Sequence, residues 1–375
     1  MMTSLLPTGS IRRSGRCLRI FSISTAGLVL LGSLIGVLGS LVLPSIASAT
    51  TTVTLYASPK GSGSCTSSSS PCSLGAAIIT AGSSTYSGDA VTVDLVDGSS
   101  GTCTASTCIF DGNFSVSGTS EASLTIEGSG TGSASSTASV LNGSNSGTTF
   151  YNSANFPVTL ENLTVTGGNA GSGDYGGGIF NQGTMTVTDS TISGNSASDG
   201  GGILNNGGST MTVVDSTISE NSAGGGGGIS AYGNMTVVDS TISGNNATYD
   251  DGGGILNSGG FFNSTITLAG SIVADQTSGG NCAGTTIIDA GYNLSNGTSC
   301  GFGTTSGSTS KDSVTNLDLS TTLANNGGPT ETIAIPGSSA AAAFISSPAT
   351  VTLGGISINL CSDTSYTTAS GYKDN

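Results

Sequence analysis

The stretch from Gly183 to Asn205, GTMTVTDSTISGNSASDGGGILN, decides the fold. Apolar and polar residues alternate in its first part, which predicts a strand with one buried face. The turn pair Asp189-Ser190 separates this strand from a second short one, and the glycine run precedes a third. Three short strands and three bends in about 25 residues predict one coil of a parallel β-helix.

Two near copies of this stretch follow, STMTVVDSTISENSAGGGGGIS from Ser209 and GNMTVVDSTISGNNATYDDGGGILN from Gly233. Coils stack at the strand spacing of about 4.8 Å, so equivalent residues form columns. The predicted core columns are Val158, Met185, Met211, Met235 and Ile266; Val165, Ile192, Ile218, Ile242 and Val273; and Ile179, Ile203, Ile229 and Ile255. We therefore predict an all-β chain, a right-handed parallel β-helix with three short sheets. About 250 residues at about 25 per coil predict roughly ten coils.

The composition of the 375 residues supports this fold. Glycine supplies 61 residues, about twice its usual share. Only 8% of the residues are charged, which excludes a helical bundle or a doubly wound nucleotide-binding fold. Hydrophobic residues make up 35%, too many for a disordered chain.

The first 49 residues predict an export signal. Four arginines precede an uncharged apolar run from Ile20 to Leu43, and Ala47-Ser48-Ala49 provides small residues for cleavage. An uncleaved membrane anchor is the alternative, because the run is long enough to span a bilayer. In both cases we expect an extracellular or cell-surface protein. Beyond the signal we predict an N-terminal cap with the first coils over residues 50–110, regular coils over 111–300 and a distinct C-terminal segment over 301–375.

The mature chain is strongly acidic. Its three lysines against 22 acidic residues leave a net charge of −19. Such a chain repels phosphate backbones and anionic lipids, which excludes nucleic acid and anionic membrane surfaces as partners. We expect a monomer.

Seven cysteines remain after the signal. In an oxidising compartment their proximity predicts three local disulfides, Cys65–Cys72, Cys103–Cys108 and Cys282–Cys300, with Cys361 left over. Zinc ligation is the alternative, but the chain has neither a C-x-x-C pair nor a histidine.

Two polar columns accompany the core columns. Asp189, Asp215 and Asp239 would stack in register, which suggests a calcium ladder. The same column continues as Asn162 and Gly270, and these residue types share turn formation rather than charge, so we favour a turn. Asn195, Asn221, Asn245 and Gln276 predict an amide column that hydrogen-bonds from coil to coil.

The loops before the glycine runs vary most between copies and supply the candidate ligand-binding residues. These are Asp174, Tyr175, Asp199, Tyr249, Asp250 and Asp251. A tyrosine beside a carboxylate can stack on and hydrogen-bond a sugar, and the acids could instead hold Ca²⁺, the one cofactor we consider. The alternative is a solvated acidic turn.

Two families resemble this chain. GGG-[IL] followed by I-S-G-N or I-S-E-N is similar to the GGA-[ILV] and FxxN repeats of the polymorphic outer membrane protein family, with Gly for Ala and Ile for Phe. That resemblance implies a β-helix and adhesion. The last quarter resembles choice-of-anchor Q domain proteins at Gly291–Leu294, Cys300–Phe302, Leu323–Thr330 and Pro336–Ala340. It departs from them at Ile333, where a histidine is usual, and lacks the closing D-Q-R-G.

We predict a structural, adhesive or glycan-binding role, with surface glycans or other cell-surface proteins as partners and no catalytic residue. The alternative is an extracellular polysaccharide-degrading enzyme, either a pectate-lyase-like enzyme or a glycoside hydrolase. Pectate lyases use Arg or Lys as the base, and no arginine follows the signal. The absence of histidine excludes Ser–His–Asp chemistry. A glycosidase with two carboxylates remains open, but the sequence shows no conspicuous second cluster of acids on the core strands.

Overall fold

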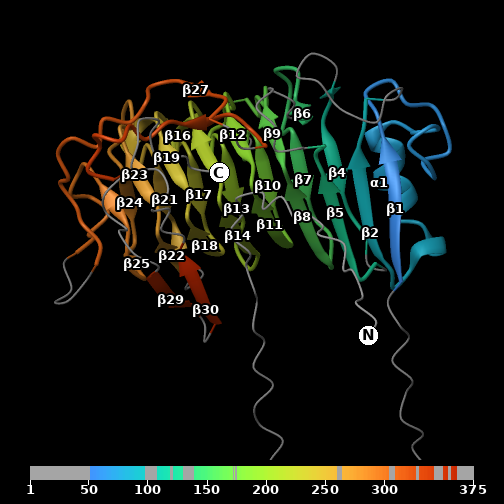
Figure 1. Cartoon of the computed structure of the whole chain (residues 1–375). Coiled ribbons are helices and arrows are strands. Elements are labelled where there is room, and N and C mark those ends of the chain that lie inside the picture. The colour runs from blue at the N-terminus through green and yellow to red at the C-terminus, as the bar shows by residue number, and fades with distance from the viewer. Residues whose placement is uncertain are drawn as a thin grey trace, which may run out of the picture.

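A computed structural model describes residues 51–97, 108–118, 121–129, 139–171, 173, 175–259, 264–303, 309–326, 329–341, 349–353 and 356–360. Figure 1 shows an elongated stack of coils that runs from the blue N-terminal end to the orange C-terminal end. Within these residues the helical segments are α1 (Leu74–Ala81) and one 3-10 turn (Ser84–Tyr86). The predicted export signal lies outside the described residues. No helix in the described part of the chain is long and apolar enough to cross a membrane.

Three parallel sheets form the sides of the stack. Sheet A contains nine strands: β1 (Thr52–Ala57), β2 (Ala90–Leu95), β5 (Ser123–Glu127), β8 (Pro157–Glu161), β11 (Thr184–Thr188), β14 (Thr210–Val214), β18 (Asn234–Val238), β22 (Ile266–Ala269) and β25 (Ile287–Asp289). Sheet B contains eight: β3 (Ile109–Asp111), β6 (Ser139–Asn142), β9 (Leu163–Thr166), β12 (Thr191–Ser193), β15 (Thr217–Ser219), β19 (Thr241–Ser243), β23 (Ile272–Ala274) and β26 (Leu294–Ser295). Sheet C contains seven: β4 (Phe114–Val116), β7 (Phe150–Asn152), β10 (Ile179–Asn181), β13 (Ile203–Asn205), β17 (Ile229–Ala231), β21 (Ile255–Asn257) and β24 (Cys282–Gly284).

Three strand pairs lie outside these sheets. They are β16 (Ser222–Gly225) with β20 (Asn246–Asp251), β27 (Leu323–Ala324) with β28 (Thr332–Ile333), and β29 (Ala349–Leu353) with β30 (Ile356–Leu360). The first pair is parallel and lies on the loops between sheets B and C, whereas the other two are antiparallel.

The register confirms the predicted core columns. On sheet A, Met185 pairs with Val158 on one side and with Met211 on the other. On sheet B, Ile218 pairs with Ile192 and Ile242. On sheet C, Ile203 pairs with Ile179 and Ile229. These side chains are buried, so each coil contributes one layer to a continuous apolar core.

The prediction of roughly ten coils was wrong. Within the described residues seven coils contribute a strand to every sheet, because sheet C has seven strands. The repeat length was taken from the regular central copies. Ala90, Ser123 and Pro157 begin successive sheet A strands about 33 residues apart, because long loops extend the first coils.

Polar ladders replace apolar columns at the corners. Asn195 Nδ2 donates to Asn221 Oδ1 at 3.0 Å, Asn221 donates in the same way to Asn245 at 3.0 Å, and Asn245 donates to the Gln276 oxygen at 3.2 Å. The predicted amide column is therefore confirmed. A serine ladder that the sequence analysis missed lies at the A–B corner, where the Ser190 and Ser216 amides each donate at 3.2 Å to the serine hydroxyl of the next coil.

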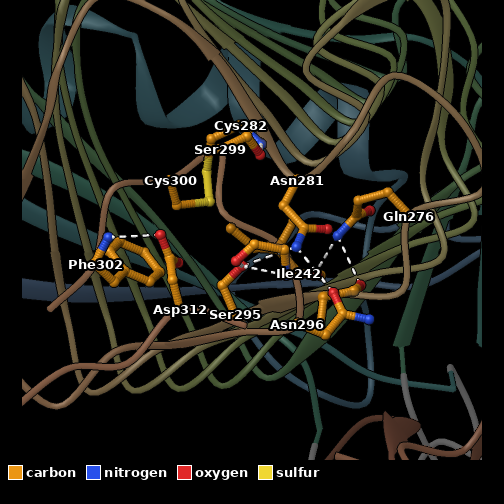
Figure 2. Close-up of a disulfide and its surroundings, with 12 residues drawn as sticks. Ile242, Gln276, Asn281, Cys282, Ser295, Asn296, Ser299, Cys300, Phe302 and Asp312 are labelled. Atoms are coloured by element: carbon orange, nitrogen blue, oxygen red, sulfur yellow. Dashed lines mark hydrogen bonds between the residues drawn. A yellow bond between two sulfur atoms is a disulfide. The ribbon is translucent and has the colours of Figure 1, made fainter. Parts of the chain in front are cut away.

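Both ends of the stack carry a disulfide. Cys65–Cys72 lies beside α1, which packs on β1, β2 and β4. Figure 2 shows Cys282–Cys300 at the other end, next to Phe302, whose backbone N–H donates to Asp312 Oδ2 at 3.0 Å. Both bonds were predicted. Cys108 is also disulfide-bonded, but Cys103 and Cys361 lie outside the described residues, so the pairing of Cys103 with Cys108 stays a prediction.

A C-terminal arm, described at residues 317–326 and 329–335, folds back over the outer face of sheet B (Figure 1). Leu317, Leu319 and Ile333 pack against Ile272 and neighbouring apolar side chains of the last coils. The tip of the arm reaches further, because the Thr191 hydroxyl lies 2.9 Å from the Thr330 hydroxyl, 139 residues away in sequence. The arm thereby buries the Thr and Ser side chains that face outward from sheet B.

Candidate functional site

Four loop segments between sheets B and C form a continuous ridge. The loop ridge consists of residues 169–175, 196–199, 222–225 and 246–251, with Ser172 and Asp174 outside the described residues. Parallel bridges join the segments at their starts, from Asn169 to Ser196, Ser222 and Asn246. The second and third segments have four residues each, whereas β20 has six. The two middle segments of the ridge are therefore the shortest.

The loop ridge contains a groove of about 380 Å³, and all four segments line it. Its lining residues are Asn169, Gly171, Ser196, Ala197, Ser198, Ser222, Ala223, Gly224, Thr248 and Tyr249. Hydroxyl groups and one aromatic ring dominate the lining, and none of its described residues is charged. We call this feature the loop groove.

Tyr249 is the most exposed large side chain of the loop groove. The residue is 77% exposed to solvent, yet one edge of its ring lies against Gly224. A flat ring that keeps most of its face in water can stack on a ligand at little cost in side-chain entropy. Tyr249 was among the residues that the sequence analysis selected.

Three other selected residues lie together in a different part of the ridge. Tyr175 pairs with Asp199, Asp199 pairs with Gly225, and Gly225 pairs with Asp251, so the four residues form one column across four coils. None of them lines the loop groove. Asp174 lies outside the described residues, and for Asp250 the structure describes only the backbone, within β20.

The column brings two carboxylates close together over a glycine. Asp199 Oδ1 and the Cβ of Asp251 each lie 3.4 Å from the position that a Cβ at Gly225 would take. Asp199 Oδ1 and the Asp251 Cβ are therefore less than about 7 Å apart. At this separation the charge of one carboxylate affects the ionisation of the other.

Burial raises the pKa of Asp199 above its ordinary value of 3.8, and the Asp251 carboxylate raises it further. A hydrogen bond from the Tyr232 hydroxyl, at 3.3 Å from Asp199 Oδ2, opposes this shift. Burial and the Asp199 charge in turn raise the pKa of Tyr232. Tyr232 follows β17 and was missed, because nothing in the repeat pattern places it opposite the Asp199 loop.

The aspartates at the A–B corner form turns, as the sequence analysis favoured. Asp189, Asp215 and Asp239 have φ values of 49°, 48° and 47°, and Asn162 and Gly270 in the same column have 58° and 63°. Asp, Asn and Gly tolerate this left-handed conformation better than other residues. In the described part of the chain no group of three or more His, Cys, Asp or Glu side chains is arranged to hold a metal ion.

Sheet A carries a column of acids that the sequence analysis overlooked. Asp94 on β2 pairs with Glu127 on β5, and Glu127 pairs with Glu161 on β8. All three are half-buried, and burial raises the pKa of Asp94. The expectation that the core strands carry no second acid cluster was therefore wrong. These coils are longer than the regular repeat, so their register could not be aligned by sequence.

Comparison with known proteins identifies no family. No family model matches the chain, and no curated protein matches it. A solved structure described as "Crystal structure of pectate lyase Pel9A" is similar, with a TM-score of 0.35 and 13% sequence identity over 66% of this chain and 68% of that chain. The resemblances to polymorphic outer membrane proteins and to choice-of-anchor Q domain proteins therefore stay predictions.

Proposed function

We propose that this protein is exported and binds glycans at or outside the cell surface, and that the loop groove holds the glycan. The observation that carries this proposal is the exposed Tyr249 ring, which lies at one end of a groove lined with hydroxyl groups. Aromatic faces and hydroxyl groups are complementary to the apolar faces and hydroxyl groups of sugars. The predicted signal and the two disulfides support export, because disulfides persist in oxidising compartments.

The charge of the protein narrows the class of glycan. None of the described lining residues is a cation, and the mature chain carries a net charge of −19. An acidic polysaccharide would be repelled by this field. We therefore expect a neutral glycan whose chain lies along the ridge, across the four loop segments.

The test is retention of the purified mature chain on a panel of neutral and acidic polysaccharides, measured by affinity electrophoresis. Tyr249→Ala should weaken binding to the retained neutral glycan about tenfold, because it removes the stacking surface. Tyr249→Phe is the matched control and should keep most of the affinity. Equal retention of the wild type and Tyr249→Ala would remove the loop groove as the binding site.

Polysaccharide hydrolysis is a second candidate, and the acid column on sheet A favours it. Neighbouring members of the column are about 4.8 Å apart at the backbone, close to the carboxylate spacing of retaining glycosidases. In such a reaction Glu127 would attack the anomeric carbon while Asp94 protonates the departing glycosidic oxygen. Water would then release the sugar from Glu127 and return a proton to Asp94.

This second candidate has a direct assay, which is the release of new reducing ends from the same polysaccharide panel. Glu127→Gln should abolish the release, whereas Glu220→Gln, on an exposed corner, should leave it unchanged. If the wild-type chain releases no reducing ends from any polysaccharide, the hydrolase candidate fails while the binding proposal stands.

A further inference from the structure

Glu121 is a buried carboxylate without a partner. It lies two residues before sheet A strand β5 and is 7% exposed. Neither of its carboxylate oxygens has a hydrogen-bond partner in the described part of the chain. A carboxylate removed from water needs hydrogen-bond donors or a cation to compensate its lost hydration.

The C-terminus of α1 lies beside the Glu121 carboxylate. One carboxylate oxygen, Oε1, lies 3.4 Å from the position that a Cβ at Gly82 would take. Gly82 caps the C-terminus of α1, and the Ile78 and Ile79 carbonyl oxygens lie 3.6 and 3.8 Å from the same position. The C-terminus of a helix carries a partial negative charge, and the last turn of α1 has no basic residue.

Three oxygens therefore border the position that a side chain at Gly82 would take, one from a carboxylate and two from backbone carbonyls. The Ile78 oxygen also accepts the Gly82 N–H at 3.0 Å, which leaves it one further lone pair. Gly82 has φ −71° and ψ 6°, a conformation that other residues adopt, so its backbone does not require glycine. The second carboxylate oxygen, Oε2, lies 3.6 Å from an added Cβ at Gly118. No positively charged group is among these described neighbours of the Glu121 carboxylate.

We propose that a calcium ion binds between the Glu121 carboxylate and the C-terminal carbonyl groups of α1. Calcium takes carboxylate and backbone carbonyl oxygens as ligands, and water completes its coordination in flexible sites. The absence of nitrogen and sulfur ligands disfavours zinc and copper. The site has a single carboxylate, so we expect the weak affinity of extracellular calcium modules, with Kd on the order of 1 mM.

The ion would connect the N-terminal cap to the first coils. α1 packs on β1, β2 and β4, and Glu121 lies on the segment that leads into β5. Binding to the folded chain alone raises its stability by mass action. Calcium binding at this site would thus stabilise the N-terminal end of the core. The site is independent of the loop groove.

The experiment is differential scanning calorimetry of the chelator-treated mature chain, with intact disulfides, at 0, 1 and 10 mM CaCl₂. At 10 mM the wild type should gain on the order of 3 °C in Tm. Glu121→Gln keeps the shape of the side chain and removes the charge, so it should lose this gain. Its calcium-free Tm should equal or exceed that of the wild type, because no buried charge remains.

Two further variants complete the test. Gly82→Ala keeps the carboxylate but fills the space beside it at ordinary contact distances, and it should also lose the gain in Tm. Glu220→Gln removes the same charge from an exposed corner and should keep the gain. The proposal is overturned if calcium leaves the wild-type Tm unchanged, or if Glu121→Gln gains as much as the wild type.

Discussion

Tyr249 and Gly224 are in direct contact across neighbouring coils. A Cβ added to Gly224 would lie 2.8 Å from Tyr249 Cε2 and 3.0 Å from Cδ2, closer than side-chain atoms pack. It would also lie 2.7 Å from the Ser198 carbonyl oxygen. The ring of Tyr249 therefore takes its position in the loop groove because residue 224 has no side chain.

Gly224→Ala should displace the Tyr249 ring and weaken glycan retention without removing the ring itself. We also expect a loss of about 1–2 kcal/mol in the free energy of unfolding, since the backbone oxygen of Ser198 must move as well. Urea unfolding and affinity electrophoresis measure the two effects. Gly337→Ala is the control, because no atom lies within 4 Å of its added Cβ; equal behaviour of the two variants would contradict the prediction.

Asn221→Ala should destabilise the protein by about 3 kcal/mol. Asn221 accepts from Asn195 and donates to Asn245, both at 3.0 Å, and it donates to the Ile192 carbonyl at 2.9 Å. The substitution leaves buried partners unsatisfied in the adjacent coils. Chemical unfolding measures the loss, and the exposed Asn155→Ala should cost less than about 0.5 kcal/mol. A small loss at position 221 would show that water replaces the amide.

The protein should be more stable at mildly acidic pH than at neutral pH. Burial raises the pKa values of Asp94, Asp199, Asp275 and Asp312. The folded chain holds these protons more tightly than the unfolded chain. Their contribution to stability is therefore complete below the ordinary pKa of 3.8 and is lost as the pH rises through the raised values.

Thermal melts between pH 3.5 and 7 measure this dependence, with Tm expected to fall as the pH rises. Repulsion within the acidic chain acts in the same direction, because it grows as carboxyl groups ionise. Asp199→Asn should flatten the profile, since the amide does not titrate. A Tm that rises from pH 4 to pH 7 would show that other carboxylates dominate the titration.

Replacing Cys282 and Cys300 together by serine should lower the free energy of unfolding by about 2–4 kcal/mol. The bond joins residues 18 apart and lies next to Phe302, which is buried at the C-terminal end of the core. Calorimetry of the double variant measures the effect. Treatment of the wild type with a reductant should cause at least as large a decrease, because it also cleaves Cys65–Cys72. Unchanged melting of the double variant would mean that Phe302 and its neighbours stabilise this end without the bond.

The sequence was sufficient for the central coils because side-chain alternation and coil stacking repeat at a nearly constant interval. Met185, Met211 and Met235 stand at equivalent positions of similar copies, so their pairing follows from alignment alone. The Asn195 ladder follows for the same reason. The acid column of Asp94 and Glu127 could not be found in this way, because long loops separate the two strands and obscure the interval.

The candidate site was only partly predictable. The variable loops pointed to Tyr249 and to Asp199, but not to the separation between them, because the sequence does not show on which side of the ridge each residue lies. The shorter middle segments that create the loop groove are visible in the sequence as length differences. Their consequence, a depression with Tyr249 at one end, depends on the stacking of all four segments.

The sequence by itself determined the all-β architecture, the core columns, the corner turns and two disulfides, because each of these depends on residues at short or regularly repeated separations. Only the tertiary structure decided the contacts between segments without a common repeat. Thr191 meets Thr330 across 139 residues, and Glu121 meets the end of α1. Such contacts follow from the way α1 and the C-terminal arm pack on the coils, and no local sequence pattern predicts that packing.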